Sequence, residues 1–196
     1  TVWQPVFDHE PVASIGALFD QLDAGLAERG RSGLDILVNN AGQGNGASIT
    51  DIDEALFDHI VASNMKSAFF VTRAALPRIP NGGRIISLSS MVSVSATPQG
   101  IVYSLAKAAL NAFTRSLAAE LGPRQISVNA IAPGATDTAL MAPIMADPAM
   151  ATWIEQMTAM GRMAHPDEIA AVAFFLASEG GWITGQTIQA SGGMHL

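Results

Sequence analysis

The sequence predicts an α/β fold, a doubly wound parallel sheet with helices on both faces, on three observations. Short apolar runs alternate along the chain with longer segments whose apolar residues recur at helical spacing. Glycine or proline separates several of these segments. Polar residues follow the apolar runs directly, where the carboxyl ends of parallel strands would form one edge of a sheet. This alternation is typical of parallel strands joined by helices.

The first half of the chain is predicted to supply two strands and two helices. Residues 6–8 are interpreted as the end of a strand, and a helix is predicted over 11–29. One face of that helix is apolar and carries Ile15, Leu18, Phe19, Leu22 and Leu26. The next strand, 35–39, is expected to be buried on both faces, as strands of parallel sheets are. Thr50 is expected to cap the second helix, because acidic residues follow it in the first turn.

The second half continues the alternation. Three strands are predicted, over 84–88, 127–132 and 187–190. A helix is predicted over 102–121, and the last helix begins after His165 with proline at its first position. Residues 139–162 break the pattern with five methionines and two prolines. We expect a substrate-binding lid there, within a single domain of residues 1–196; a loosely packed pair of surface helices is the alternative.

Composition excludes several classes of protein. With 196 residues, 49% of them hydrophobic and 14% charged, the chain can bury the core of one domain. A net charge of −7 argues against a nucleic-acid partner. The absence of cysteine excludes disulfides and thiol nucleophiles and fits a cytoplasmic protein. The longest apolar run is too short for a membrane span, and the four histidines lack the spacing of a metal site.

Tyr103 is the only tyrosine of the chain, and Lys107 follows it four positions later on a predicted helix. Residues at this spacing share a helix face, and an ammonium beside a phenol favours the phenolate. Lys107 is therefore expected to lower the pKa of Tyr103 from about 10 toward neutrality, which would make the phenol a usable general acid and base. The alternative is a chance pairing on an amphipathic helix.

Other polar residues are expected near this pair. Asn64 lies inside a predicted helix, where asparagine is unfavourable unless it is exposed or has a role such as organising a water. Ser89 and Ser90 follow the 84–88 strand, and small residues at 39–42 follow the strand before it, where a plain turn is the alternative. A Ser-His-Asp hydrolase is disfavoured because no GxSxG motif surrounds a serine.

The order and spacing of six stretches resemble those of the short-chain dehydrogenase/reductase family, in particular its branch like β-ketoacyl-acyl-carrier-protein reductase. These stretches are DILVNNAG at 35–42, Asn64 in ASNMKSAFF, Ser90 after RIISLS, YSLAK at 103–107, SVNAIAPGATDT at 127–138 and TGQTIQASGG at 184–193. The resemblance runs from about Asp8 to the C-terminus and implies a Rossmann-like sheet. It further implies a nicotinamide-dependent oxidoreductase that interconverts a ketone and a secondary alcohol, with NAD or NADP as cofactor.

The resemblance also implies a role for each site residue. Tyr103 exchanges a proton with the substrate oxygen, and Lys107 lowers its pKa and binds the nicotinamide ribose. Ser90 holds the substrate oxygen and Asn64 a water; the thirteen-residue spacing to Tyr103 favours Ser90 over Ser89. The implied cofactor contacts are Asp8, His9, Asn40, Ala41, Gly42, Tyr103, Lys107, Pro133, Gly134, Thr136 and Thr138. The family often has isoleucine at the position of Thr136, a change that a backbone contact should tolerate.

One expected feature of the family is absent from this sequence, namely the opening β-α-β unit with its glycine-rich turn for the cofactor pyrophosphate. The choice between NAD and NADP is made in that unit and is therefore not readable. A catalytically silent fragment or scaffold, unable to hold the pyrophosphate, is the alternative function. Relatives pack the helices of Asn64 and Tyr103, and the last helix and strand, across two-fold axes, which implies a homotetramer or homodimer.

Overall fold

The structure is a computed structural model that describes residues 14–44 and 46–194. Four parallel strands form one sheet in the order β1-β2-β3-β4. The strands are β1 (Ile36–Asn39), β2 (Arg84–Leu88), β3 (Ser127–Pro133) and β4 (Thr187–Ala190). The predicted parallel α/β architecture is confirmed, whereas the strand end predicted at residues 6–8, like the contacts expected of Asp8 and His9, lies outside the described residues.

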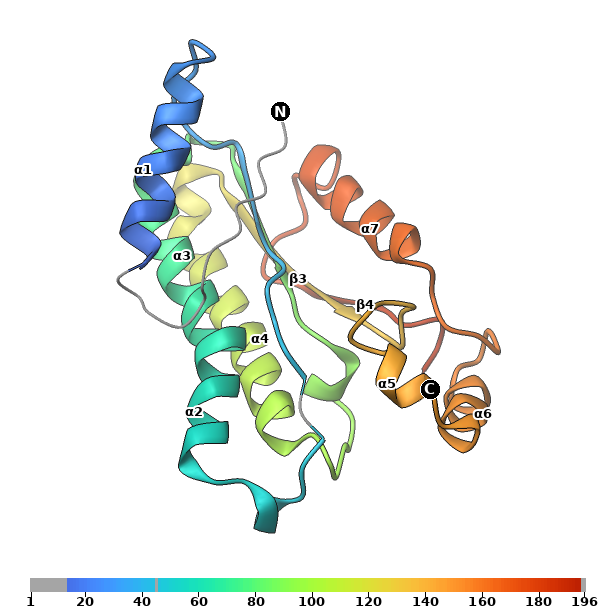
Figure 1. The fold of residues 1–196 in the computed structure, drawn as a ribbon. Coiled ribbons are helices and arrows are strands. Elements are labelled where there is room, and N and C mark those ends of the chain that lie inside the picture. The colour runs from blue at the N-terminus through green and yellow to red at the C-terminus, as the bar shows by residue number, and fades with distance from the viewer. Residues whose placement is uncertain (1–13, 45, 195–196) are drawn as a thin grey trace.

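Helices cover both faces of the sheet (Figure 1). Those on one face are α1 (Ser14–Ala27), α2 (Glu54–Val61), α3 (Ser67–Ala75) and α4 (Ile101–Leu121). The opposite face carries α7 (Pro166–Ser178), which packs against β2 and β3. Two short helices, α5 (Ala142–Met145) and α6 (Pro148–Met157), lie beyond the carboxyl end of the sheet (Figure 1). The carboxyl edge therefore lies between the long helices and this last pair.

Two apolar clusters fill the layers. The larger joins α1, α3 and α4 to one face of the sheet, and the apolar positions predicted for α1 belong to it, with Leu26 only partly buried. The smaller cluster, around Ile86, Ile131 and Leu176, lies between the other face and α7. Strands β2 and β3 are thus covered on both sides, and such burial is the main contribution to the stability of a fold of this kind.

The prediction that the 35–39 strand is buried on both faces is wrong. In β1, Leu37 and Asn39 are buried, but Ile36 and Val38 are 40% and 46% exposed. The reason is the position of β1 at the edge of the described sheet, where Leu37 joins the larger cluster while α7 packs on β2 and β3. An apolar run indicates a strand, but the number of covered faces depends on neighbours that the run does not specify.

The start of the second helix also differs from the prediction. Thr50 lies in a 3-10 turn, and α2 is instead capped by Asp53, whose carboxylate accepts a hydrogen bond of 2.8 Å from the Leu56 backbone N–H. Asp53 stands three residues before Leu56, the geometry that an N-cap requires. The last helix starts as predicted, with Pro166 at its first position, and His165 and Glu168 form a reciprocal capping box.

Candidate active site

Tyr103 and Lys107 lie on the same face of α4, one turn apart, and this face meets the carboxyl end of β2. The Lys107 ammonium Nζ donates a hydrogen bond of 2.7 Å to the backbone oxygen of Leu88, the last residue of the strand. The same nitrogen stands 5.5 Å from the centre of the Tyr103 ring. The Ser90 side chain lies close enough to the Tyr103 hydroxyl to influence its pKa. Strand end and helix thus place a phenol, an ammonium and a hydroxyl together.

Asn64 is fully buried, so the interpretation of Asn64 as an exposed helix residue is wrong. It lies in a π-helical segment, Ala62–Lys66, between α2 and α3, where the backbone bonds shift by one residue. Its side-chain nitrogen donates to the Gln43 carbonyl at 2.8 Å, and its side-chain oxygen accepts from the Gln43 N–H at 3.1 Å. The amide therefore holds the loop that follows β1, a role that sequence reasoning did not assign to it.

Ser89 and Ser90 occupy different environments. Ser89 is 4% exposed, and its hydroxyl lies 2.7 Å from the side-chain oxygen of Asn111 on α4. Ser90 is the residue whose hydroxyl meets Tyr103. Alternation along an extended segment sends neighbouring side chains in opposite directions, which accounts for the difference. Asn111 was not among the expected residues, although its spacing of eight from Tyr103 places it on the same helix face.

The expected lowering of the Tyr103 pKa by Lys107 is not found. Burial raises the pKa of Tyr103, and the hydrogen bond with Ser90 opposes that rise. Burial also lowers the pKa of Lys107 to about 8. The physical reason is that the ammonium is committed to the Leu88 carbonyl, in a buried site that disfavours charge on either group. The phenol is consequently protonated at neutral pH, the form that can donate a proton.

The residues predicted to line the adenosine ribose, Asn40, Ala41 and Gly42, are exposed directly after β1. Gly42 lies so close to the polar cluster that a Cβ atom there would stand 2.6 Å from the side-chain oxygen of Asn64 and 3.1 Å from Lys107 Nζ. Only glycine fits without displacing these groups. The backbone at this edge is thus open to a ligand that approaches Lys107.

A second loop borders the edge after β3. Pro133 is the last residue of that strand, and a Cβ on Gly134 would lie 2.8 Å from the Ser191 backbone oxygen. The hydroxyls of Thr136 and Thr138 donate to backbone oxygens of their own loop, at 3.0 and 3.3 Å. These two hydroxyls are used within the loop itself. A ligand would therefore contact the backbone of the loop and not these hydroxyls. The loops after β1 and β3 both lie at the carboxyl ends of strands, the edge where open α/β sheets bind their ligands.

The 139–162 segment contains α5 and α6, joined by a short turn. Its exposed apolar residues are Leu140, Ile144, Met150, Trp153 and Met160. Leu140 reaches the loop after β1, since its Cδ1 atom lies 3.3 Å from the position of a Cβ on Gly44. The segment thereby contacts the same loop that Asn64 holds. It presents apolar side chains beside the candidate site.

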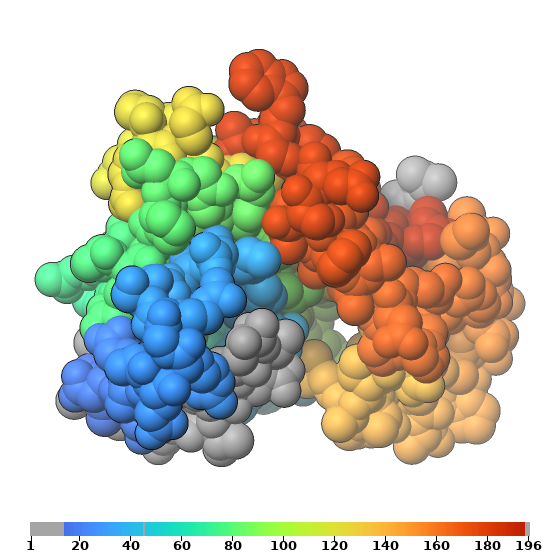
Figure 2. Space-filling model, turned by 90° about the horizontal axis from the view of Figure 1, so that it is seen from above, coloured from blue at the N-terminus to red at the C-terminus, as the bar shows by residue number. Residues whose placement is uncertain are grey.

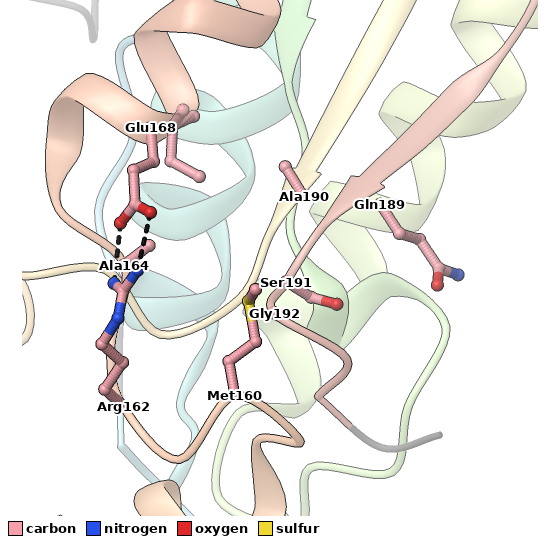
Figure 3. Close-up of a pocket in the computed structure, with 9 residues that line it drawn as sticks. Met160, Arg162, Ala164, Glu168, Gln189, Ala190, Ser191 and Gly192 are labelled. Atoms are coloured by element: carbon pink, nitrogen blue, oxygen red, sulfur yellow. Dashed lines mark hydrogen bonds and ion pairs between the residues drawn. The ribbon is translucent and has the colours of Figure 1, made fainter.

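A separate cavity of about 230 Å³ lies between the start of α7 and β4 (Figure 3). Arg162 and Glu168, which line this cavity, form a bidentate salt bridge with two hydrogen bonds of 2.8 Å. Hydrogen bonds from Arg162 hold the pKa of Glu168 at about 2, so the two charges neutralise each other. The cavity includes none of the predicted catalytic residues, and we place the chemistry at Tyr103, where donors converge.

Two further observations concern metals and membranes. Within residues 14–44 and 46–194, no three histidine or acidic side chains gather as a metal site would require. None of the described helices is long and apolar enough to cross a membrane.

A parallel sheet with open loops at its carboxyl edge, and with a tyrosine, a lysine and a serine gathered there, defines an oxidoreductase of the dinucleotide-binding α/β class. A family model described as enoyl-(acyl carrier protein) reductase matches residues 9–195. The chain belongs to the short-chain dehydrogenase/reductase family, whose enzymes depend on NAD or NADP.

Individual relatives agree with this assignment. The chain is 40% identical over 177 residues to an oxidoreductase of Methylorubrum extorquens, covering 89% of this chain and 70% of the relative. It is 37% identical over 165 residues to the 3-oxoacyl-[acyl-carrier-protein] reductase of Aquifex aeolicus, covering 83% and 66%. The solved structure of the angucycline C-6 ketoreductase LanV with bound NADP superposes with a TM-score of 0.89 at 38% identity, covering 96% and 73%.

Proposed function

We propose that the chain interconverts a ketone and a secondary alcohol by hydride transfer, with Tyr103 as the general acid in reduction and the general base in oxidation. The observation that carries the proposal is the gathering of Tyr103, Lys107 and Ser90 at the carboxyl end of β2, where Lys107 Nζ stands 5.5 Å from the centre of the Tyr103 ring and donates to the Leu88 carbonyl. Two neighbouring hydroxyls can hold one substrate oxygen between them. A proton donor already in place is what a developing alkoxide requires.

A reduced nicotinamide, when bound, supplies a hydride to the carbonyl carbon. Ser90 orients the carbonyl oxygen, and Tyr103 gives that oxygen its phenolic proton as negative charge develops. Lys107, buried beside the ring, binds the ribose hydroxyls and so holds the cofactor next to Tyr103. Asn64 keeps the loop after β1 in place. Its part in a water relay stays a prediction, because the described bonds already occupy its side chain.

Several residues support the cofactor proposal. We assign the backbone of Asn40 to Gly42 to the adenosine ribose side and that of the loop from Pro133 to Thr138 to the nicotinamide carboxamide. NADP in the LanV structure supports NADP, while NAD remains open for this chain. Asp8 and His9 stay predicted adenine contacts. The absence of cysteine supports the cytoplasmic setting that we propose.

The substrate that we propose is an apolar carbonyl compound, and residues 139–162 are its lid. Exposed apolar side chains of this segment, among them Leu140 and Ile144, would contact the part of the substrate away from the carbonyl. Methionine and leucine side chains adapt to apolar shapes better than polar ones do. The name of LanV, a ketoreductase of angucyclines, supports a polycyclic ketone as a first test compound.

The experiment that tests the function follows the near-ultraviolet absorbance of NADPH or NADH mixed with the protein and a series of aromatic ketones. We expect loss of that absorbance with at least one ketone and formation of the matching alcohol. A chain that binds either nicotinamide yet converts none of the ketones would favour the alternative, a catalytically silent scaffold. Failure to bind either nucleotide would contradict the cofactor proposal itself.

We also propose that the chain assembles into a homodimer or homotetramer. The segment at the end of α7 and the turn after it stand out from the surface (Figure 2). Phe174 is 72% exposed there and Trp182 is 96% exposed. Exposed apolar patches, unlike single exposed side chains, mark interaction sites, and we propose that these two aromatic side chains belong to such an interface. Phe57, Phe69 and Leu105 expose a second apolar surface on α2, α3 and α4.

Sedimentation equilibrium is expected to report two or four times the chain mass of 20.4 kDa. Replacing both Phe174 and Trp182 by serine should lower the assembly state, since the apolar surface that these two side chains expose is lost. Replacing the exposed Val94 by serine, on a different element, is the control and should leave the mass unchanged. A wild-type chain that stays monomeric at every concentration would contradict the assembly proposal.

A further inference from the structure

Helix α4 carries a third polar residue in line with the tyrosine and the lysine. Tyr103, Lys107 and Asn111 stand at successive intervals of four, so the three side chains form one stripe along the helix. Each of them contacts the segment that leaves β2. Tyr103 meets Ser90, Lys107 meets Leu88, and Asn111 meets Ser89 and Ser93. Residues 88–93 are therefore held against helix α4 by contacts on three successive turns of the helix.

Asn111 uses both ends of its amide in this contact. Its side-chain oxygen accepts a hydrogen bond of 2.7 Å from the Ser89 hydroxyl, and its side-chain nitrogen donates one of 2.9 Å to the Ser93 hydroxyl. The Ser93 hydroxyl in turn donates to the Ser90 backbone oxygen at 2.6 Å. A continuous chain of donors and acceptors thus runs from Ser89 through Asn111 and Ser93 back to the backbone of Ser90.

Two members of this chain of bonds lie out of water, while Ser93 is half-buried. Asn111 is 7% exposed and Ser89 is 4% exposed. A buried amide is costly to desolvate unless both its ends are satisfied, so these partners hold it in one orientation. In the sequence, Ser90 lies between Ser89 and Ser93, the two serines that form hydrogen bonds with Asn111. The Ser90 hydroxyl also caps the 3-10 turn Met91–Ser93. Movement of Ser93 would therefore displace the backbone that carries the Ser90 hydroxyl.

We propose that Asn111 and Ser93 are positioning residues that set the place of the Ser90 hydroxyl against Tyr103, and thereby the geometry in which the substrate oxygen is held. The inference rests on the proposed function for its kinetic consequence. Neither residue touches the substrate oxygen in this arrangement, and both act through Ser90. Small errors in the position of a reacting group cost catalysis far more than they cost binding.

The test compares Ser93→Ala and Asn111→Leu with the wild type. Ser93→Ala removes the link to the Ser90 backbone and is expected to lower kcat about tenfold while KM and the dissociation constant of NADPH stay within about twofold. Asn111→Leu removes both bonds and should lower kcat further. Ser93→Thr keeps the hydroxyl and should restore kcat to within about threefold of the wild type.

Thr114→Val is the matched control, because Thr114 is a fully buried residue of the same helix whose hydroxyl has no hydrogen-bond partner in the described part of the chain. It should leave kcat within about twofold of the wild type. If Ser93→Ala lowers kcat no more than Thr114→Val does, or if Ser93→Thr fails to restore it, the positioning role is overturned.

A second readout does not depend on turnover. Tyr103 is the only tyrosine, so the phenolate absorbance of the folded protein titrates this residue alone. Since the hydrogen bond with Ser90 opposes the rise of the Tyr103 pKa, loosening it in Ser93→Ala should raise the titration midpoint by about half a pH unit. Thr114→Val should not move the midpoint.

The two readouts separate the inference from the proposed function. A shifted midpoint in a protein that converts no ketone would support the positioning role and count against the proposed reaction. An active enzyme in which neither kcat nor the midpoint responds to Ser93→Ala would overturn the inference while leaving the reaction supported.

Discussion

Tyr103→Phe is expected to lower kcat for ketone reduction by about a thousandfold or more, while the dissociation constant of NADPH stays within about twofold. The substitution removes one hydroxyl and keeps the ring, so the contact of the ring with Lys107 persists. What is lost is the only proton donor that the described structure places beside Ser90. The measurement is steady-state kinetics with the ketone identified in the absorbance assay, together with a binding titration.

Ser104→Ala is the matched control for this variant. Ser104 is the next residue of α4, and its buried hydroxyl has no hydrogen-bond partner among the residues described. Loss of that hydroxyl should change kcat less than about threefold. An unchanged rate in Tyr103→Phe would refute the role of Tyr103, and a loss of NADPH affinity equal to the loss of rate would assign the residue to binding instead.

The direction of the Tyr103 pKa also sets a pH dependence. Because burial raises this pKa, the phenol is protonated at neutral pH and is ready to donate in reduction. Reduction should therefore lose rate in two steps as the pH rises, first near pH 8, where the buried Lys107 ammonium loses its proton, and again above the Tyr103 pKa. Alcohol oxidation uses the phenolate as base, so its Tyr103 limb should rise with pH through the midpoint of the phenolate titration.

The elements that could be predicted from the sequence are those whose signals are local. The strand over 84–88 and the strand over 187–190 were bounded correctly by apolar runs between polar and glycine residues. The start of α7 was recognisable because proline and acidic residues stand together in its first turn. Such signals depend on the chain within a few residues, and the tertiary fold did not override them.

Three features could not be predicted, because each depends on residues far apart in the sequence. The exposed face of Ile36 and Val38 follows from which strands α7 covers. The hydrogen bonds between the Asn64 side chain and the Gln43 backbone join residues 21 positions apart, and Asn64 reaches Gln43 from the π-helical segment. The pKa of Lys107 follows from its burial where α4 packs against β3 and the 3-10 turn Met91–Ser93. In each case spacing identified the residue and packing decided its environment.

The candidate site shows the same division. The thirteen-residue spacing distinguished Ser90 from Ser89, and the structure places Ser90 beside Tyr103. Spacing did not indicate the residues that hold Ser90 in place. Asn111 and Ser93 belong to residue types that are usually exposed, so nothing in the sequence pointed to a buried role for them. Their importance rests on shared hydrogen bonds that only the folded chain brings together.

Lys107→Met is expected to stabilise the protein and to inactivate it. Lys107 is 3% exposed, and its pKa falls from 10.5 to about 8 on burial, so the fold opposes its charge at neutral pH. A shift of this size corresponds to a cost of about 3 kcal/mol at pH 7. Methionine has a similar length and no charge, but it leaves the Leu88 carbonyl without its donor, at a cost of about 1 kcal/mol. The expected net gain in the free energy of unfolding is about 2 kcal/mol.

The gain should depend on pH in a defined direction. The penalty for burying the ammonium is fully present below the folded pKa of about 8 and fades as the pH rises to the unfolded value of 10.5. In that window the unfolded chain binds more protons than the folded chain, so wild-type stability should rise with pH. Urea denaturation at several pH values should show this rise in the wild type and its absence in Lys107→Met.

Lys66→Met is the control, because Lys66 is the other lysine of the chain and is exposed on the neighbouring π-helical segment. It should change stability by less than about 0.5 kcal/mol and keep its activity. In Lys107→Met we expect kcat to fall by about a hundredfold or more, because the ammonium that we assign to the nicotinamide ribose is gone and the cofactor is no longer held in place beside Tyr103. A variant that is less stable than the wild type at pH 7 would show that the Leu88 bond outweighs the burial of charge. Greater stability with lost activity would show that this buried charge is retained for its chemistry, at the expense of the fold.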